Sequence, residues 1–197
     1  AKDVKDGELN GIFYRKNRFE EVSHKVWSMT KRADTLTMLE LKDLKTGKCF
    51  AVFNTHLAFS KIDNREAQAR FIADKIEFFV KKMPVILTGD MNTFPNRLDL
   101  TALPFNDGDY IHRILTNKSL KDAKDVSLLG HLGPLSTFSN DGESVVPFSG
   151  TGTPGVFLDH IYVSQRVTVI IHAVEPGTVN GHFPSDHLPV LMDFVLD

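Results

Sequence analysis

The chain has 197 residues, 42% of them hydrophobic and 24% charged, and this size and composition are typical of one globular domain that buries roughly 70% of its unfolded surface. Lys and Arg total 23 and Asp and Glu total 25, for a net charge of -2, which excludes a strongly basic nucleic-acid coat but not a local basic groove. The single cysteine, Cys49, excludes an intrachain disulfide, and no apolar run reaches the length of about 18 residues that spans a bilayer.

The first half of the chain predicts a hairpin, a helix and a buried strand. We expect strands at residues 9–15, 35–41 and 49–54. A polar turn containing Gly47 separates the last two, which favours an antiparallel hairpin. Apolar residues recur every three or four positions over residues 63–82, the spacing of an amphipathic helix. Pro84 ends this helix and begins an apolar strand that leads to Asp90.

The second half is less regular. Residues 98–132 mix polar and apolar positions and predict one or two helices, and residues 139–155 form a loop rich in Gly, Ser, Thr and Pro. Two strands, at residues 157–163 and 188–195, close the chain. Strands that pair as hairpins while helices lie between them favour an α+β sandwich over a doubly wound parallel sheet.

Compact polar groups lie at the ends of four of the expected strand regions. They are Asn54-Thr55-His56, Gly89-Asp90-Met91-Asn92, Leu158-Asp159-His160 and Ser185-Asp186-His187. Strand ends on a rigid scaffold can direct side chains into one cleft, so these residues are candidates for metal-assisted hydrolysis. Each segment alone also admits a structural role, such as a turn at Asp90 or a core position for His56. His160 alternates with Asp159 and is expected to face the other side of its strand.

Taken together and in this order, the four segments resemble the endonuclease/exonuclease/phosphatase superfamily of deoxyribonuclease-I-like hydrolases. Gly-Asp-x-Asn at residues 89–92, followed at a distance by Ser-Asp-His at residues 185–187, is the specific part of the match. The resemblance extends from about residue 7 to the C-terminus. It implies a four-layer αββα sandwich of two mainly antiparallel sheets. It also implies hydrolysis of a phosphate ester that depends on Mg²⁺ or Mn²⁺.

The resemblance also implies a role for each site residue. His187 would be the general base and Asp159 would orient its imidazole. Asp90 and Asn92 would position the nucleophile and the phosphate, and His56 would donate a hydrogen bond to a phosphate oxygen. The implied metal ligands are Asp90, Asn92 and Asp186. These residue types suit the chemistry, because Mg²⁺ takes oxygen ligands and phosphoryl transfer needs charge neutralisation and a placed nucleophile. Zinc is disfavoured by the absence of a Cys cluster and of closely spaced histidines.

The match departs from the family pattern in two places. The family's metal site uses an Asn and a Glu on two strands that precede the segment resembling residues 9–14, and this chain has no counterpart of them. We therefore expect residues 1–197 to be a single domain that holds the C-terminal three quarters of the fold. The remainder would be missing from this chain or lost from the protein. Phe157 stands where relatives carry an Arg, which removes one possible phosphate contact.

The substrate class stays open at this stage. We expect a monomeric phosphodiesterase acting on nucleic acid, a phospholipid or a small phosphate ester. The alternative is a catalytically silent interaction domain that keeps the sandwich without a complete metal site.

Overall fold

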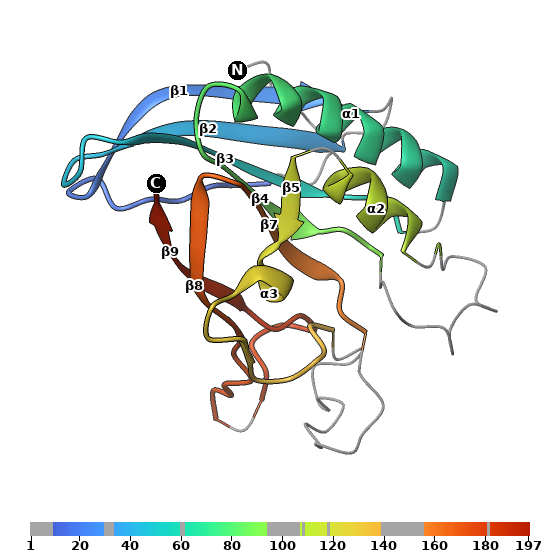
Figure 1. Ribbon diagram of the computed structural model, residues 1–197. Helices are drawn as coiled ribbons and strands as arrows, with labels where there is room; N and C mark the ends of the chain where they lie inside the picture. The colour runs from blue at the N-terminus through green and yellow to red at the C-terminus, as the bar shows by residue number, and fades with distance from the viewer. Residues whose placement is uncertain are drawn as a thin grey trace.

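The computed structural model describes residues 10–29, 34–59, 62–93, 107, 109–117, 119–138, 156–180 and 182–197. It contains a six-stranded and a three-stranded sheet that pack face to face, with helices over the outer face of the larger sheet (Figure 1). The larger sheet has the strand order β1-β2-β3-β4-β7-β5, and the smaller has the order β6-β8-β9. Most neighbouring strands run antiparallel, while β3–β4 and β6–β8 are parallel. The expected sandwich of two mainly antiparallel sheets is confirmed.

The bounds of the elements are as follows. The strands of the larger sheet are β1 (Phe19–Ser28), β2 (Thr35–Asp43), β3 (Cys49–His56), β4 (Val85–Asp90), β5 (Leu120–Asp122) and β7 (Asp159–Ser164). The smaller sheet consists of β6 (His131–Leu132), β8 (Val167–Val174) and β9 (Val190–Leu196). The helices are α1 (Ile62–Val80), α2 (Tyr110–Thr116) and α3 (Ala123–Val126). None of these helices is long and apolar enough to cross a membrane.

Alternation along the strands divides the core into two layers. On the outer face of the larger sheet, residues such as Phe53 and Leu87 pack against α1 and α2. On its inner face, residues such as Phe50 and Ile86 meet the smaller sheet, including Val169 of β8. The apolar residues at helical spacing between residues 63 and 82 thus form the face of α1 that covers the sheet.

The N-terminal part of the chain differs from the sequence prediction. Residues 10–15 were expected within a strand, but the structure places them outside the sheets. Their apolar alternation reflects packing instead, since Ile12 and Tyr14 contact the inter-sheet core while Phe13 is exposed. The Asn54 side chain donates to the Gly11 carbonyl, so a side chain holds this segment in place of a strand partner.

Three further differences concern strands. β1 was not predicted, because most of its side chains are exposed and no apolar alternation marks it. β8 was also not predicted, although its run of β-branched residues is a strand signal. The stretch expected to be helical also contains the short strands β5 and β6 beside α2 and α3. The expected loop at residues 139–155 lies outside the described residues.

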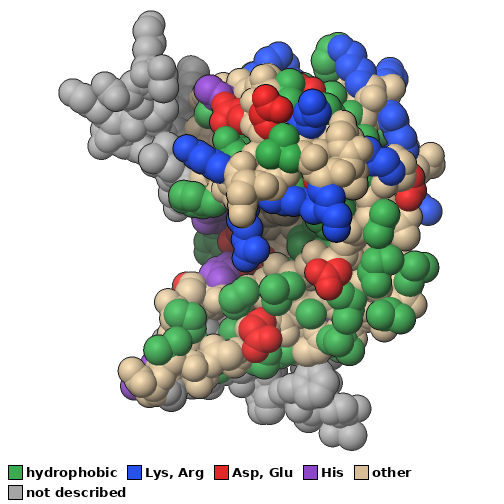
Figure 2. Space-filling view, turned by 90° about the vertical axis from the view of Figure 1, so that its left-hand side faces the viewer, with side chains coloured by type: hydrophobic (Ala, Val, Ile, Leu, Met, Phe, Trp, Pro, Cys, Tyr) green, Lys and Arg blue, Asp and Glu red, His purple; other side chains and the backbone are tan. Residues whose placement is uncertain are grey.

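The smaller sheet leaves a hollow against the larger one. An apolar cavity of about 590 Å³ is lined from both sheets, by Phe50 and Ile86 on one side and by Met192 and Phe194 on the other. Figure 2 shows the side of the molecule that lies on the left in Figure 1. This side is hollowed, with Lys and Arg side chains along one rim of the hollow and hydrophobic side chains along the other. The functional groups that the sequence singles out lie at the carboxyl ends of β3 and β4, at the start of β7 and in the loop before β9.

Candidate active site

Strand pairing brings three of the expected site residues side by side. In the parallel β3–β4 pair His56 lies opposite Asp90, and in the antiparallel β4–β7 pair Asp90 lies opposite Asp159. Side chains at directly opposed positions share a face of the sheet and lie within contact distance. The three residues therefore form a row across the end of the larger sheet, with Asp90 in the centre.

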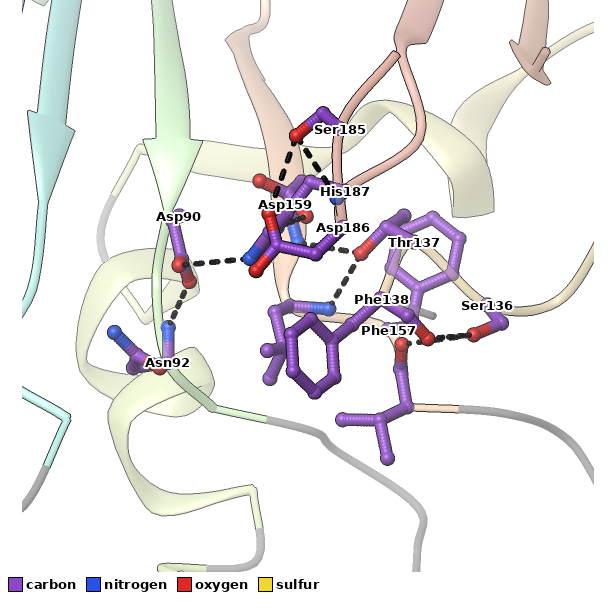
Figure 3. A network of polar contacts seen from close by, with 12 residues as sticks. Asp90, Asn92, Ser136, Thr137, Phe138, Phe157, Asp159, Ser185, Asp186 and His187 are labelled. Carbon is purple, nitrogen blue, oxygen red and sulfur yellow. Dashed lines mark hydrogen bonds and ion pairs between the residues drawn. The ribbon is translucent and has the colours of Figure 1, made fainter. Parts of the chain in front are cut away.

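His187 joins this row from the loop before β9. Its Nδ1 lies 2.7 Å from Oδ2 of Asp159 (Figure 3). A carboxylate only accepts, so Nδ1 carries the proton and the Nε2 lone pair of the neutral ring points away from Asp159. That Nε2 is 3.9 Å from Oδ2 of Asp90. The hydrogen bond with Asp159, followed by the charges of Asp159, Asp90 and Asp186, raises the pKa of His187 above its usual value against the effect of burial.

Asp90 occupies an electrostatically unfavourable position. Burial and the neighbouring Asp159 carboxylate together raise the pKa of Asp90 above its ordinary value. The Asn92 backbone N–H donates to its Oδ1 at 2.8 Å, and His56 Nε2 lies 3.3 Å from its Oδ2. Two adjacent carboxylates in a half-buried site, with ligand oxygens within 4.8 Å of each other, are the donors that a divalent cation would neutralise.

Asn92 is fixed by its backbone and by its amide. It adopts a left-handed conformation, with φ 47°, which Asn tolerates better than most residues. Its side-chain nitrogen donates to the Leu57 carbonyl at 2.7 Å and lies 3.0 Å from His56 Nε2. Because the carbonyl can only accept, the nitrogen end of the amide must face Leu57 and His56. The turn expected at residues 89–92 and the polar site are therefore the same feature.

Gly89 explains why this segment begins with glycine. Its φ is +149°, and a Cβ built on it would lie 2.0 Å from the Thr55 carbonyl oxygen on β3. The close approach of the two backbones permits the parallel pairing that aligns His56 with Asp90. The glycine of the Gly-Asp-x-Asn pattern thus sets the strand geometry under the site.

The structure brings together five of the six expected residues in one contact network and places the sixth beside it. His56, Asp90, Asn92, Asp159 and His187 are linked by the contacts above, and the potential ligand atoms of Asp90, Asp159 and His187 lie within 4.8 Å of one another. Asp186 is outside that group of three. Its carboxylate accepts from Ser185 Oγ at 3.2 Å.

Arg65 and Asp107 support the site in a way that the sequence did not reveal. Arg65 is fully buried, donates to the carbonyls of Ala58 and Phe59 and forms an ion pair with Asp107. Asp107 also accepts from the Thr93 hydroxyl at 2.6 Å. The loops that follow His56 and Asn92 are therefore joined through one buried guanidinium. In the sequence Arg65 is a charged residue one turn into an amphipathic helix, a position that does not indicate this role.

A second group of potential ligand atoms lies on the other face of β7. It consists of His112, Asp122 and His160, whose ligand atoms also lie within 4.8 Å of one another. His160 Nδ1 lies 2.8 Å from Asp122 and its Nε2 lies 3.1 Å from the Phe157 carbonyl, while His112 contacts the Tyr162 hydroxyl. These hydrogen bonds account for the group as a structural network between α2, β5 and β7. The expectation that His160 faces away from Asp159 is correct.

Phe157 belongs to the core. It is 9% exposed, and its ring packs against the imidazoles of His131, His160 and His172. The side chain that replaces the family's Arg is therefore turned into the protein and away from the cleft.

The family model described as the Endonuclease/Exonuclease/phosphatase family matches residues 4–187. The chain belongs to this family. Members of the endonuclease/exonuclease/phosphatase family are hydrolases that act on phosphate esters. The order of the site segments along the chain, which suggested the family, is the order in which β3, β4, β7 and the loop before β9 deliver the residues described above.

Individual proteins are similar to this chain in sequence or in fold. The CCR4-Not complex 3'-5'-exoribonuclease subunit Ccr4 of Kluyveromyces lactis is 26% identical over a 243-residue alignment that covers 98% of this chain and 30% of that protein. An endonuclease/exonuclease/phosphatase from Bacteroides vulgatus superposes with a TM-score of 0.74 at 24% identity, over 93% of this chain and 69% of that one. The mannosyl-6-phosphatase Bt3783 of Bacteroides thetaiotaomicron gives a TM-score of 0.71 at 22% identity, over 93% and 70% of the two chains. This chain spans less than a third of the length of the curated relatives that it matches.

Proposed function

We propose that this domain hydrolyses phosphodiesters with the help of a divalent cation, using a water molecule activated by His187. The observation that carries the proposal is the position of His187 between two carboxylates. Asp159 orients the imidazole through Nδ1, and the other ring nitrogen faces Asp90. An imidazole that is oriented by one carboxylate, with the lone pair of its other nitrogen directed away from that carboxylate, is suited to general base catalysis.

His187 takes a proton from the attacking water at Nε2 in this proposal. Asp159 keeps the proton on Nδ1 and stabilises the imidazolium that results, since the ion pair forms only when the ring is charged. The pKa of His187 is raised, so the ring binds the transferred proton more strongly than an isolated imidazole would. Asp90 faces the same nitrogen and stabilises the same charge.

Asp90, Asn92 and Asp186 are the proposed metal ligands. The raised pKa of Asp90, caused by burial and by the adjacent Asp159, supports a cation site, because a positive charge there would relieve both effects. Mg²⁺ and Mn²⁺ bind through one or two carboxylates and retain several waters. When bound, such an ion supplies Lewis-acid neutralisation of the phosphate charge.

His56 and Asn92 complete the proposed site by contacting the phosphate. His56 lies at the end of β3, on the opposite side of Asp90 from His187. We assign it the donor that stabilises negative charge on a non-bridging oxygen in the transition state. Asn92 holds His56 in place by donating from its side-chain nitrogen to Nε2, so the neutral His56 ring would donate to the phosphate from Nδ1.

The substrate class rests on the chemistry that relatives share. One relative is named as an exoribonuclease and one structural neighbour as a sugar phosphatase. Both cleave a P–O bond, and both would need the same base and the same charge neutralisation. We favour a diester, which includes nucleic acids, phospholipids and small diesters, and the first measurement below separates a diester from a monoester.

The test is hydrolysis of bis-p-nitrophenyl phosphate and, in parallel, of the monoester p-nitrophenyl phosphate, with Mg²⁺ or Mn²⁺ and with EDTA. We expect turnover of the diester that EDTA abolishes and that His187→Ala lowers by about 10²–10⁴-fold. His24→Ala, which removes an exposed histidine on β1, is the matched control and should retain wild-type turnover. Preferred hydrolysis of the monoester would replace the diesterase proposal with a phosphatase.

A binding measurement separates the metal site from catalysis. Mn²⁺ should raise the Tm of the wild-type chain, because a ligand that binds only the folded state stabilises it, and Asp90→Asn should remove most of this rise. A folded chain with neither turnover nor a Mn²⁺-dependent shift would support the alternative, a silent interaction domain.

A further inference from the structure

One buried residue, Thr137, contacts both chain segments that carry the proposed base and its partner. Asp159 begins β7, and His187 lies in the loop that precedes β9. Nothing in the strand pairing of the two sheets joins these positions directly, since β7 and β9 belong to different sheets. Their side chains nevertheless meet at 2.7 Å. Some other contact must therefore set the distance between the two segments.

The Thr137 hydroxyl fixes the first segment. Its Oγ1 accepts the backbone N–H of Leu158 at 2.9 Å and that of Asp159 at 3.0 Å (Figure 3). These two consecutive donors lie where β7 begins, and Thr137 itself is fully buried. An acceptor for buried N–H groups stabilises the segment that contains them, so the hydroxyl, together with the β4–β7 pairing, holds the Asp159 backbone in place.

The backbone of the same residue fixes the second segment. The Thr137 carbonyl accepts the N–H of Leu188 at 2.8 Å. The neighbouring residue, Phe138, forms an isolated antiparallel bridge with His187, and its ring lies 5.0 Å from the imidazole. The position of His187 therefore depends on the same short stretch of chain that holds Asp159.

We propose that Thr137 is a positioning residue for the Asp159–His187 pair. It acts on the reaction through these two side chains and does not contact the substrate. The inference rests on the proposed function, in which the pair activates water, but the geometry that it predicts for the two side chains is measurable without any activity. A displacement of about 1 Å in such a pair can reduce catalysis about 10²-fold.

Thr137→Val tests the hydroxyl at constant shape. The valine methyl group replaces Oγ1, so the Leu158 and Asp159 N–H groups lose their acceptor. We expect kcat for bis-p-nitrophenyl phosphate to fall by about 10–100-fold with KM nearly unchanged, because binding contacts are retained and the transition-state contact is misplaced. Thr137→Ser keeps the hydroxyl and should restore kcat to within about 3-fold of wild type.

Ser164→Ala is the matched control. Ser164 ends β7, is buried, and its Oγ accepts the backbone N–H of Val85 at 2.9 Å. The change therefore removes the same kind of hydrogen bond from the same strand, at the end away from Asp159. It should lower stability to a similar degree and leave kcat unchanged. An equal loss of kcat in both variants would overturn the proposal, because the loss would then follow from a weakened β7.

A double-mutant cycle tests whether Thr137 affects kcat through the Asp159–His187 pair. In an Asp159→Asn background the pair is already impaired, so Thr137→Val should reduce kcat much less than it does in the wild-type chain. Fully multiplicative losses would contradict the proposal. If Thr137→Val does not fold, Thr137→Ala replaces it in both experiments, and wild-type kcat in that variant would equally overturn the assignment.

An NMR measurement is independent of turnover. A hydrogen bond to a carboxylate moves the Nδ1–H proton of an imidazole downfield, so His187 should give such a signal in the wild-type chain and in Ser164→Ala. Thr137→Val should lose or shift it. If the wild-type chain shows no turnover but this pattern holds, the proposed function fails while the positioning role stands. An unchanged His187 signal in a folded Thr137→Val chain would reject the role.

Discussion

Asp159 is the residue on which the properties of His187 depend most. Its carboxylate accepts the Nδ1–H of His187 and contributes the largest effects that raise the pKa of that ring. Asp159→Asn keeps the shape of the side chain but removes the charge. We expect kcat to fall by about 10²–10⁴-fold, with little change in the denaturant midpoint, since Asp159 is only half-buried.

The same substitution should move the pH profile in a defined direction. A base must be neutral to accept a proton, so activity declines as the pH falls below the pKa of His187. That pKa is raised in the wild-type chain, and without the carboxylate it falls toward its ordinary value. The acid limb of kcat/KM should therefore lie at lower pH in Asp159→Asn. Asp193→Asn, on an exposed position of β9, should leave the limb in place, and an acid limb that does not move in Asp159→Asn would assign it to another group.

The pairing of β3 with β4 depends on the absence of a side chain at Gly89. Gly89→Ala would place a Cβ 2.0 Å from the Thr55 carbonyl at φ +149°. The strands must then separate, and we expect a loss of at least about 2–3 kcal/mol in the free energy of unfolding, measured by urea denaturation. Gly47→Ala is the control. It has a φ of +75° and no neighbouring atom within 4 Å, so only the backbone conformation is penalised, by about 1 kcal/mol. Equal losses would contradict the close approach.

The junction of β5, α3 and β7 depends on a buried ion pair. Asp122 and His160 are both almost fully buried, and Asp122 also caps α3 by accepting the Lys124 N–H. Burial favours the neutral acid, yet the hydrogen bond with His160 and the nearby charges keep the pKa of Asp122 below its ordinary value. Asp122→Asn leaves His160 without its charged partner and should cost about 3–5 kcal/mol. Asp125→Asn, at an exposed position of α3, should cost little, and similar stability of the two variants would refute the argument.

The elements that the sequence predicts well are those with a strong period. α1 has an apolar spacing that matches one buried face, and β2, β3 and β4 have apolar residues that pack on both faces of the larger sheet. β1 lacks that signal, because tertiary pairing with β2 holds a strand whose side chains remain largely exposed. The apolar alternation at residues 10–15 gave a false strand, since packing against the inter-sheet core produces the same pattern as pairing.

The identities of the site residues can be predicted from the sequence, but their arrangement in space cannot. Four polar segments at strand ends indicate the chemistry, but the row of His56, Asp90 and Asp159 requires the order β3-β4-β7, which joins strands far apart along the chain. No local pattern assigns a role to Thr137 or to Arg65, because Thr137 bonds the backbone of the distant Asp159 and Arg65 pairs with the distant Asp107. Residues that position a site are recognised only once the chain is folded.

At the scale of the whole molecule, a buried pair of imidazoles links folding to pH. His131 Nε2 lies 3.0 Å from the Pro134 carbonyl, which can only accept, so His131 donates there. Its Nδ1 then accepts from His172 Nδ1 at 2.9 Å. His172 Nε2 is left as a buried lone pair with no partner among the described residues. Burial, followed by the charge of His131, lowers the pKa of His172 to about 4.

This pKa makes His172 a source of acid lability. In the unfolded chain the pKa of His172 returns to about 6.5. Between pH 6.5 and about pH 4, the unfolded state therefore binds a proton at His172 and the folded state does not. The contribution of His172 to stability therefore falls as the pH is lowered through this window, whereas Asp90, whose pKa is raised, contributes in the opposite direction. His187 does not oppose the trend, because the contribution of a group with a raised pKa is complete at low pH and is lost only as the pH rises through that pKa.

His172→Gln isolates this contribution, because it removes one titrating group and leaves the others. The urea midpoint of the wild-type chain should decline from about pH 7 to about pH 4.5, and the decline should be shallower in His172→Gln, whatever the variant's stability at neutral pH. His24→Gln replaces an exposed histidine and should reproduce the wild-type slope. If His172→Gln keeps the full wild-type slope, the proton excluded from the folded state belongs to another residue. The half-buried His112, whose pKa burial also lowers, would then be the next to replace.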